Sequence, residues 1–201
     1  MALSAGLAAC GAPDYRYVKS TKDRTFVRLP ADWQVFDEDQ LLENSTESAE
    51  AKEQFKQLTW SVAFDAAPKP SPENVLSVSS HPSGLVQVRT LSPAQRDAFS
   101  LADLRSLLLQ FDPLAENSDE ASQVEVLASN DVERPGGLHG SEMLLNIQTP
   151  GGDVVKWRQI ALIDSSVERV HVLAVSCDAE CYDKNESVID RVVESWKVKE
   201  R

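Results

Sequence analysis

Residues 138–176 read LHGSEMLLNIQTPGGDVVKWRQIALIDSSVERVHVLAVS and carry three β-prone runs in close succession. With the run that precedes them, the β-prone runs are 123–132, 139–149, 154–163 and 167–176. The links are short and rich in turn-forming residues: ERPGG (133–137), TPGGD (149–153) and DSSVE (164–168). Glycine supplies positive φ and proline presets a bend. Strands joined by such short links are antiparallel neighbours, so this half of the chain is predicted to be a four-stranded meander.

The segments on either side of the meander have the residue spacing of helices. Residues 186–198 place large apolar side chains on one helical stripe, which predicts a helix packed on the sheet. Residues 92–111 form the clearest helical region, with a Ser92-Pro93 start and a second cap-like pair, Ser100 with Asp103. Pro113 is expected to end this helix.

The first part of the chain alternates between strand and helix patterns. A strand is expected from Tyr15 to Val18, a hairpin-like pair in 25–36, one or two surface helices in 37–57, a half-buried strand at 59–65, and short strands at 75–80 and 85–91. The resulting order, β-α-β-α-ββββ-α, predicts an α+β fold. Its antiparallel sheet should have about six to seven strands and lie between helical layers, as an α/β/α sandwich.

Charge and hydropathy exclude several classes of protein. The 201 residues include 32 acidic and 20 basic side chains, a formal net charge of −12. Such a charge repels nucleic-acid phosphates and anionic bilayer surfaces. No run of 18 apolar residues occurs, so no transmembrane helix is expected.

A lipoprotein signal is indicated by Leu7-Ala8-Ala9-Cys10, which has the form of a bacterial lipobox. In such a motif the cysteine thiol receives a diacylglyceryl group and becomes the new N-terminus. Only nine residues precede Cys10, none of them Lys or Arg, so we expect the sequence as given to start late. On this interpretation 1–9 are a signal-peptide remnant, 10–20 a lipid tether, and 21–201 a single domain at the extracytoplasmic face of the membrane. The alternative is an ordinary buried or free cysteine in a frayed terminus.

Cys177 and Cys181 are predicted to form a disulfide. Setting Cys10 aside leaves an even number of cysteines, and exported chains occupy an oxidising compartment. The pair lies four residues apart where the last strand gives way to the last helix, within disulfide reach. A redox pair usually has two intervening residues, and a metal pair would lack partners.

No catalytic, cofactor or metal residues are predicted. His81, His139 and His171 do not stand at metal-ligand spacing with one another or with a cysteine. His171 alternates with valines, as a face-lining or hydrogen-bonded histidine would. Ser141 follows His139 in GGLHGSEM, but the segment lacks the G-x-S-x-G elbow of a nucleophile turn.

The sequence resembles the PsbP/Mog superfamily in several segments. These are FVRLPADW (26–33) with its Pro30 and Trp33 turn, the Ser- and Leu-rich central helix, the meander, and the ending VVESWKV. More narrowly, it resembles the lipobox-bearing cell-envelope lipoproteins of actinobacteria that share this fold. The resemblance covers 15–198 and implies an antiparallel sheet between helical layers. Members of the superfamily include extrinsic photosystem proteins and a Ran-binding protein, which act by docking.

Two classes of function follow from these features. The first is a membrane-tethered, non-enzymatic binding or accessory domain that serves another envelope component close to the membrane. Because the chain is acidic, its contact surface is then expected to face basic groups or cations. The second is a small envelope enzyme or ligand-carrying protein. A deep apolar pocket with convergent polar groups would favour the second class, and a filled core with shallow grooves the first.

Overall fold

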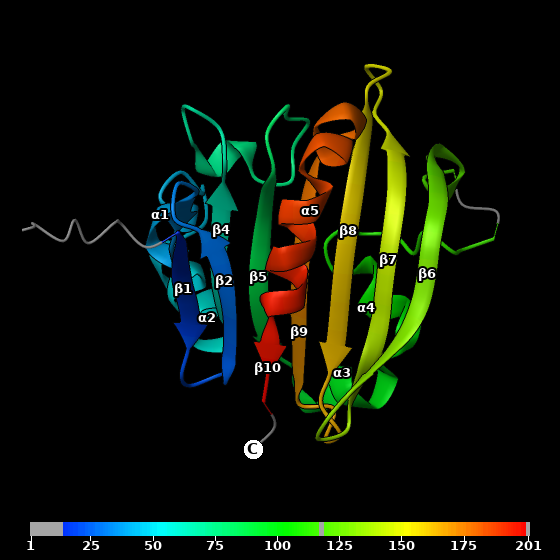
Figure 1. The fold of residues 1–201 in the computed structure, drawn as a ribbon. Coiled ribbons are helices and arrows are strands. Elements are labelled where there is room, and N and C mark those ends of the chain that lie inside the picture. The colour runs from blue at the N-terminus through cyan, green and yellow to red at the C-terminus, as the bar shows by residue number, and fades with distance from the viewer. Residues whose placement is uncertain (1–13, 117–118, 200–201) are drawn as a thin grey trace, which may run out of the picture.

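The computed structural model describes residues 14–116 and 119–199, which form two antiparallel sheets and their covering helices. The larger sheet has the order β3-β4-β5-β9-β8-β7-β6, and the smaller has the order β1-β2-β10 (Figure 1). The smaller sheet comprises β1 (Tyr15–Ser20), β2 (Thr25–Pro30) and β10 (Lys197–Val198). The larger sheet comprises β3 (Gln34–Phe36), β4 (Thr59–Asp65), β5 (Ser83–Thr90), β6 (Val124–Arg134), β7 (Leu138–Gln148), β8 (Val154–Ile163) and β9 (Arg169–Asp178).

The helices and the smaller sheet cover both faces of the larger sheet. The helices are α1 (Glu38–Leu42), α2 (Ala49–Leu58), α3 (Pro93–Ala98), α4 (Leu101–Ser106) and α5 (Ala179–Ser195), with 3-10 turns η1 (Pro72–Asn74) and η2 (Ala121–Gln123). Helix α5 and the smaller sheet lie on one face, and α4 lies behind the meander on the other (Figure 1). The α+β fold with a seven-stranded antiparallel sheet between covering layers confirms the predicted class.

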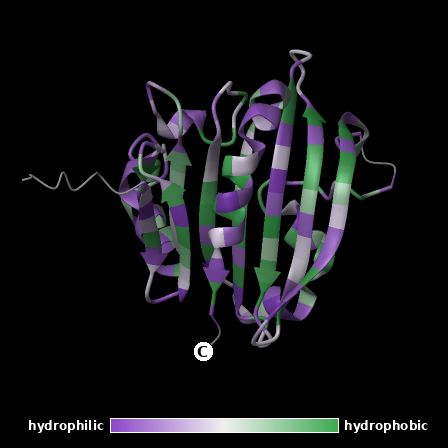
Figure 2. Cartoon of the chain, viewed as in Figure 1, coloured by the Kyte–Doolittle hydropathy of each residue, from purple (hydrophilic) through white to green (hydrophobic). Residues whose placement is uncertain are grey.

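The predicted meander is present as β6, β7, β8 and β9, each pairing antiparallel with the next. Gly136 and Gly137 have φ of 88° and 81°, and Gly152 has 89°, so the glycines of two links supply the positive φ that the turns need. Strand β9 is buried along nearly its whole length because both of its faces are covered. Figure 2 shows hydrophobic residues along these strands and hydrophilic residues on the outward side of α5.

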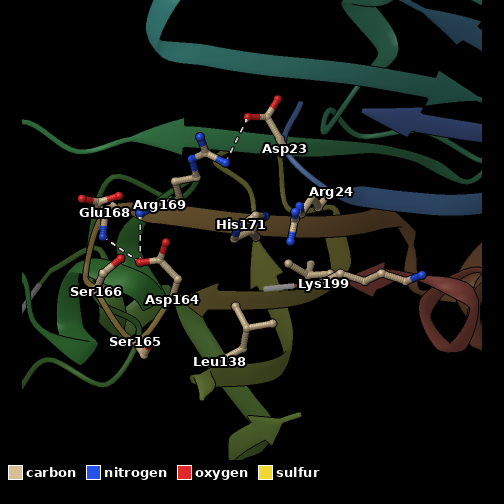
Figure 3. Close-up of a pocket in the computed structure, with 11 residues that line it drawn as sticks. Asp23, Arg24, Leu138, Asp164, Ser165, Ser166, Glu168, Arg169, His171 and Lys199 are labelled. Carbon is tan, nitrogen blue, oxygen red and sulfur yellow. Dashed lines mark hydrogen bonds and ion pairs between the residues drawn. The ribbon is translucent and has the colours of Figure 1, made fainter. Parts of the chain in front are cut away.

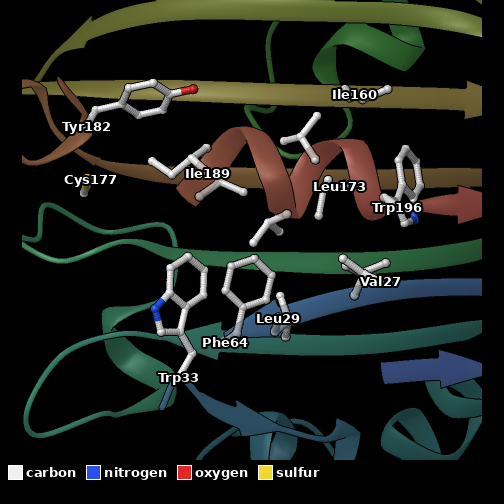
Figure 4. Close-up of a cluster of buried hydrophobic side chains, with 14 of the residues drawn as sticks. Val27, Leu29, Trp33, Phe64, Ile160, Leu173, Cys177, Tyr182, Ile189 and Trp196 are labelled. Atoms are coloured by element: carbon white, nitrogen blue, oxygen red, sulfur yellow. The ribbon is translucent and has the colours of Figure 1, made fainter. Parts of the chain in front are cut away.

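The principal core lies between the larger sheet and the layer of α5 and β2 (Figure 4). Val27 and Leu29 of β2 are fully buried there, as is Ile189 of α5. Trp196 follows α5 and donates from Nε1 to Thr25 Oγ1 at 3.0 Å. This contact joins the two ends of the described chain. Residues near both ends pack in the same core.

The expected hairpin in 25–36 is wrong, because β2 and β3 belong to different sheets. Strand β2 pairs with β1 and β10, whereas β3 pairs with β4. The chain crosses between the sheets in the turn closed by Trp33 N donating to Pro30 O at 3.2 Å. Trp33 then stacks on Phe64 with ring centroids 5.5 Å apart, so burial of the tryptophan directs the crossing.

Three other segments differ from the expected elements. The helix at 92–111 is two short helices with separate capping boxes, and the second ends at Ser106, well before Pro113. The last helix begins at Ala179 because Asp178 accepts a hydrogen bond from Cys181 N at 2.7 Å, and 197–198 form β10. Residues 75–80 are turns and bends, where Leu76 has φ of 58°. The surface helices of 37–57 are present as α1 and α2.

Strand β4 is buried on both faces and is not half-buried as expected. Strand β3 pairs with only three residues of β4, from Ala63 to Asp65. Beyond β3, Ser61 N donates to Glu38 Oε1 at 2.9 Å, so a carboxylate takes the place of the missing strand partner. Within the described ranges, no helix is long and apolar enough to cross a membrane.

The ordered fold begins within the predicted tether. Residues 15–20, the second half of the predicted tether, form β1 and pair with β2 along its whole length. Cys10 and the predicted signal-peptide remnant lie outside the described residues.

Candidate functional site

A charged cleft lies where the ends of both sheets meet, and we call it the strand-end cleft (Figure 3). It has a volume of about 120 Å³. Its lining comes from the β1–β2 turn, the start of β7, the β8–β9 turn, the start of β9 and the end of β10: Asp23, Arg24, Leu138, Asp164, Ser165, Ser166, Glu168, Arg169, His171, Val198 and Lys199. Segments that are far apart in the sequence therefore build it.

The Asp164 carboxylate holds the β8–β9 turn. Its Oδ1 accepts hydrogen bonds from the backbone N of Glu168 at 2.7 Å and of Arg169 at 3.2 Å (Figure 3). These bonds satisfy backbone donors that the turn would otherwise leave without partners. Asp164 thus has a structural task in the cleft.

A second carboxylate links the two sheets. Asp23 is 7% exposed, and its Oδ2 accepts a hydrogen bond from the Ser20 hydroxyl at 2.7 Å. Its Oδ1 lies 3.9 Å from Arg169 Nη1, and the same nitrogen donates to Lys22 O at 3.5 Å. Arg169 of β9 is thereby attached to the β1–β2 turn, and both acidic groups described so far stabilise loops.

His171 lies at the base of the cleft and is 3% exposed. Burial lowers the pKa of its imidazole to about 4; the carboxylates of Asp164 and Asp23 oppose this shift, and Arg169 adds to it. The ring is therefore neutral at pH 7. Its Nδ1 has no hydrogen-bond partner among the described residues, so the expectation of a hydrogen-bonded histidine is not met at that atom.

A second cleft, which shares Val198 and Lys199 with the first, has a volume of about 350 Å³. It is lined by Arg134, Pro135, Leu162, Trp196, Lys197, Val198 and Lys199. Leu162 and Trp196 in its lining are 2% and 6% exposed. Three basic side chains and no acidic one line it.

The structure does not bring the three histidines together. His171 lines the strand-end cleft, whereas His81 lines a different cleft with Asp32 and Arg191. His139 is exposed at the start of β7, with Nδ1 3.1 Å from Gly137 O. Ser141 is buried in the same strand, at 4% exposure. In the described part of the chain, no group of three or more His, Cys, Asp or Glu residues is placed to hold a metal ion.

Cys177 and Cys181 are joined at the junction of β9 and α5. Their Sγ atoms lie 2.15 Å apart and their Cα atoms 5.9 Å apart, which is the disulfide distance that the four-residue spacing predicted. Both side chains are buried, Cys177 completely.

The smaller sheet carries a concentration of basic residues that the overall charge of the chain conceals. Residues 14–30 and 197–199 contain seven basic and two acidic side chains, in a chain whose net charge is −12. A charge count along the sequence shows the excess in 14–30. That the last strand joins the same sheet is visible only in the tertiary structure.

Comparison with known proteins identifies the fold. No family model matches the sequence, and no curated protein matches it by sequence. Among solved structures, cyanobacterial PsbP (CyanoP) from Synechocystis sp. PCC 6803 is similar with a TM-score of 0.52 and 11% identity, over 97% of this chain and 98% of that one. The likeness shows a PsbP-like fold, as the resemblance implied.

Two further structures give lower scores. LpqN, described as involved in cell envelope biogenesis of Mycobacterium tuberculosis, has a TM-score of 0.48 and 10% identity, over 94% of this chain and 93% of that one. The Saccharomyces cerevisiae Ran-binding protein Mog1p has a TM-score of 0.47 and 10% identity, over 93% of this chain and 96% of that one.

Proposed function

We propose that this protein is a non-enzymatic accessory domain of the cell envelope, tethered by lipid on Cys10 and acting by docking on another envelope component. The observation that carries the proposal is the Cys177–Cys181 pair at disulfide distance. Disulfides persist in oxidising compartments and are rare in the cytosol. An exported chain with these two cysteines paired has Cys10 as its remaining thiol, and that residue ends a lipobox.

The short spacing between Cys10 and the fold supports the anchoring. Cys10 and Tyr15, the first residue of β1, are five residues apart. A fully extended chain spans at most about 17 Å over that separation. A lipid on Cys10 would therefore hold the domain against the membrane, where its partner should also lie. The actinobacterial lipoproteins that the sequence resembles have the same combination of lipobox and fold.

The strand-end cleft supports docking over catalysis. Its volume of about 120 Å³ is below the 300–1,000 Å³ typical of small-molecule sites, and the second cleft, at about 350 Å³, lies at the lower end of that range and has no acidic side chain in its lining. Asp164 and Asp23 are engaged in holding turns, and a histidine with a pKa of about 4 is a weak base. These side chains stabilise the fold and do not form a nucleophile–base pair.

The anchoring is tested on protein isolated from its native cells. We expect the mature N-terminal residue to be Cys10 with a diacylglyceryl modification, and the protein to enter the detergent phase on phase separation. Cys10→Ala should move it to the aqueous phase, whereas the matched control Cys177→Ala/Cys181→Ala should stay in the detergent phase. An unmodified Cys10 in the intact mass of the native protein would refute the tether.

A further inference from the structure

Positive charge is segregated onto the smaller sheet. Its strands and their adjoining turn residues, 14–30 and 197–199, carry seven basic side chains against two acidic ones. The basic residues are Arg16, Lys19, Lys22, Arg24, Arg28, Lys197 and Lys199. The rest of the chain has thirteen basic and thirty acidic side chains. The net charge of −12 therefore does not describe this sheet.

The strand register separates an inner face of this sheet from an outer one. Val18 lies opposite Val27, and Val198 lies opposite Thr25, so these residues share the face that packs on the core. The other parity brings Lys19, Phe26 and Lys197 into one row across the three strands. Both lysines are exposed.

Aromatic side chains lie among these cations. Tyr17 is opposite Arg28 in the register and is 70% exposed. The Arg28 guanidinium carbon lies 4.4 Å from the centre of the Tyr15 ring, a cation–π contact. We call this surface the basic face, and its members are Tyr15, Tyr17, Lys19, Phe26, Arg28 and Lys197. Tyrosine among basic residues is typical of surfaces at the membrane–water interface.

The nearby carboxylates do not cancel this charge. Asp23 is buried beside Ser20, and on α5 Asp183 and Asp190 pair with Lys156 and Arg158 of β8. Asp14 and Asp32 line a cleft with Tyr15 at one edge of the basic face, and Glu194 lies three residues before Lys197. They are offset by flanking cations at its edges: Arg16, Lys22, Arg24, Arg191 and Lys199.

We propose that the basic face docks on the phosphate headgroups of an anionic bilayer and so orients the tethered domain. This inference rests on the proposed function, because a lipid on Cys10 would bring β1 to the headgroups. Charge complementarity and the five-residue separation of Cys10 from Tyr15 both favour the bilayer as the occupant. The alternative occupant is an acidic protein, which would need to enter the narrow space that the short tether leaves between this face and the membrane.

The interaction is expected to be weak without the anchor and effective with it. Each basic side chain near an anionic surface strengthens binding by about fivefold. Carboxylates more than about 8 Å from the surface are screened at physiological salt. A short tether adds a local concentration in the millimolar range, which is enough for weak contacts to become populated. An acyl anchor and a basic patch together are a known means of stable membrane attachment.

The test uses the full 201-residue chain carrying Cys10→Ser, mixed with vesicles at millimolar lipid and separated by flotation. We expect binding to vesicles of equal parts phosphatidylglycerol and phosphatidylcholine, and at least tenfold weaker binding to pure phosphatidylcholine. Lys19→Glu/Lys197→Glu changes two exposed residues and should reduce the binding by at least tenfold. The matched control Lys52→Glu/Lys69→Glu makes the same change in net charge elsewhere and should leave binding within about twofold. Circular dichroism checks that each variant is folded.

A second measurement tests the docked orientation. The unmodified chain is coupled through the Cys10 thiol to a maleimide lipid, and hydrogen exchange is followed in β1. The amides of β1 should exchange at least fivefold more slowly on the anionic vesicles than on phosphatidylcholine. Equal exchange on both surfaces, or equal binding by the two double variants, would overturn the basic face as a docking surface. The vesicle assays do not depend on native lipidation, so their failure is distinct from failure of the tether.

Discussion

His171 shows how one buried residue makes stability depend on pH. Its imidazole is nearly inaccessible, and burial lowers its pKa to about 4 from an ordinary value near 6.5. Between pH 6.5 and pH 4 this histidine is protonated in the unfolded chain but stays neutral in the folded chain. Stability from this group is therefore complete above pH 6.5 and is lost as the pH falls toward 4.

At pH 4 the loss from this histidine is expected to be about 3 kcal/mol, because one pKa unit corresponds to about 1.4 kcal/mol. His171→Gln should remove that part of the pH dependence, so its free energy of unfolding should fall less between pH 7 and pH 4. Urea denaturation at several pH values measures the difference. His139→Gln, which replaces an exposed histidine, is the control. Parallel profiles for wild type and His171→Gln would contradict the assignment.

At the scale of elements, the junction of β9 and α5 is held in two ways. Asp178 caps the helix by accepting a hydrogen bond from Cys181 N at 2.7 Å. The disulfide joins the end of the strand to the first turn of the helix. The closed loop is short. A loop of this length gains about 2 kcal/mol in the chain-entropy model, so the disulfide secures the junction and does not hold the whole fold together.

Reduction of the disulfide should lower the free energy of unfolding by about 2 kcal/mol and leave the native circular dichroism spectrum intact. Cys177→Ala/Cys181→Ala should lose at least as much, because both side chains are buried and their removal also leaves space in the core. Dithiothreitol should have no further effect on this variant. If reduction left the stability of the wild type unchanged, the disulfide would have no stabilising role.

At the scale of the whole molecule, the smaller sheet and the rest of the chain have different proposed tasks. The smaller sheet carries the basic face beside the predicted anchor, and the remainder of the chain is strongly acidic. An acidic body held near a membrane is suited to a partner with basic groups. Association of that kind weakens as salt rises, since the charges are exposed.

A docking role predicts that the residues most open to a catalytic interpretation are dispensable. Variants with alanine in place of His139, Ser141 or His171, each expressed in a deletion strain, should restore the wild-type phenotype. The measurement is complementation, with immunoblotting and membrane fractionation to show that each variant is present and anchored. If a folded, anchored variant failed to complement, the result would favour the alternative that the protein is an enzyme.

The sequence by itself determined the meander, the starts of the two central helices and the disulfide spacing. Each depends on residues close in the chain: alternating side chains and short links for β6 to β9, Ser92 and Ser100 as caps, and a separation of four residues from Cys177 to Cys181. Of the candidate site, the sequence placed His171 on a strand face but did not predict the cleft, because Asp23, Asp164 and Val198 come from distant segments.

Only the tertiary structure decided which strands share a sheet and where the charge gathers. Strand β2 pairs with β10, about 170 residues later, because Val27, Leu29 and Trp196 are buried together in one core. Such pairing depends on the free energy of burying a whole set of apolar side chains, which no local pattern contains. The same pairing places Lys197 beside Phe26 and Lys19, and so produces a basic face on an acidic protein.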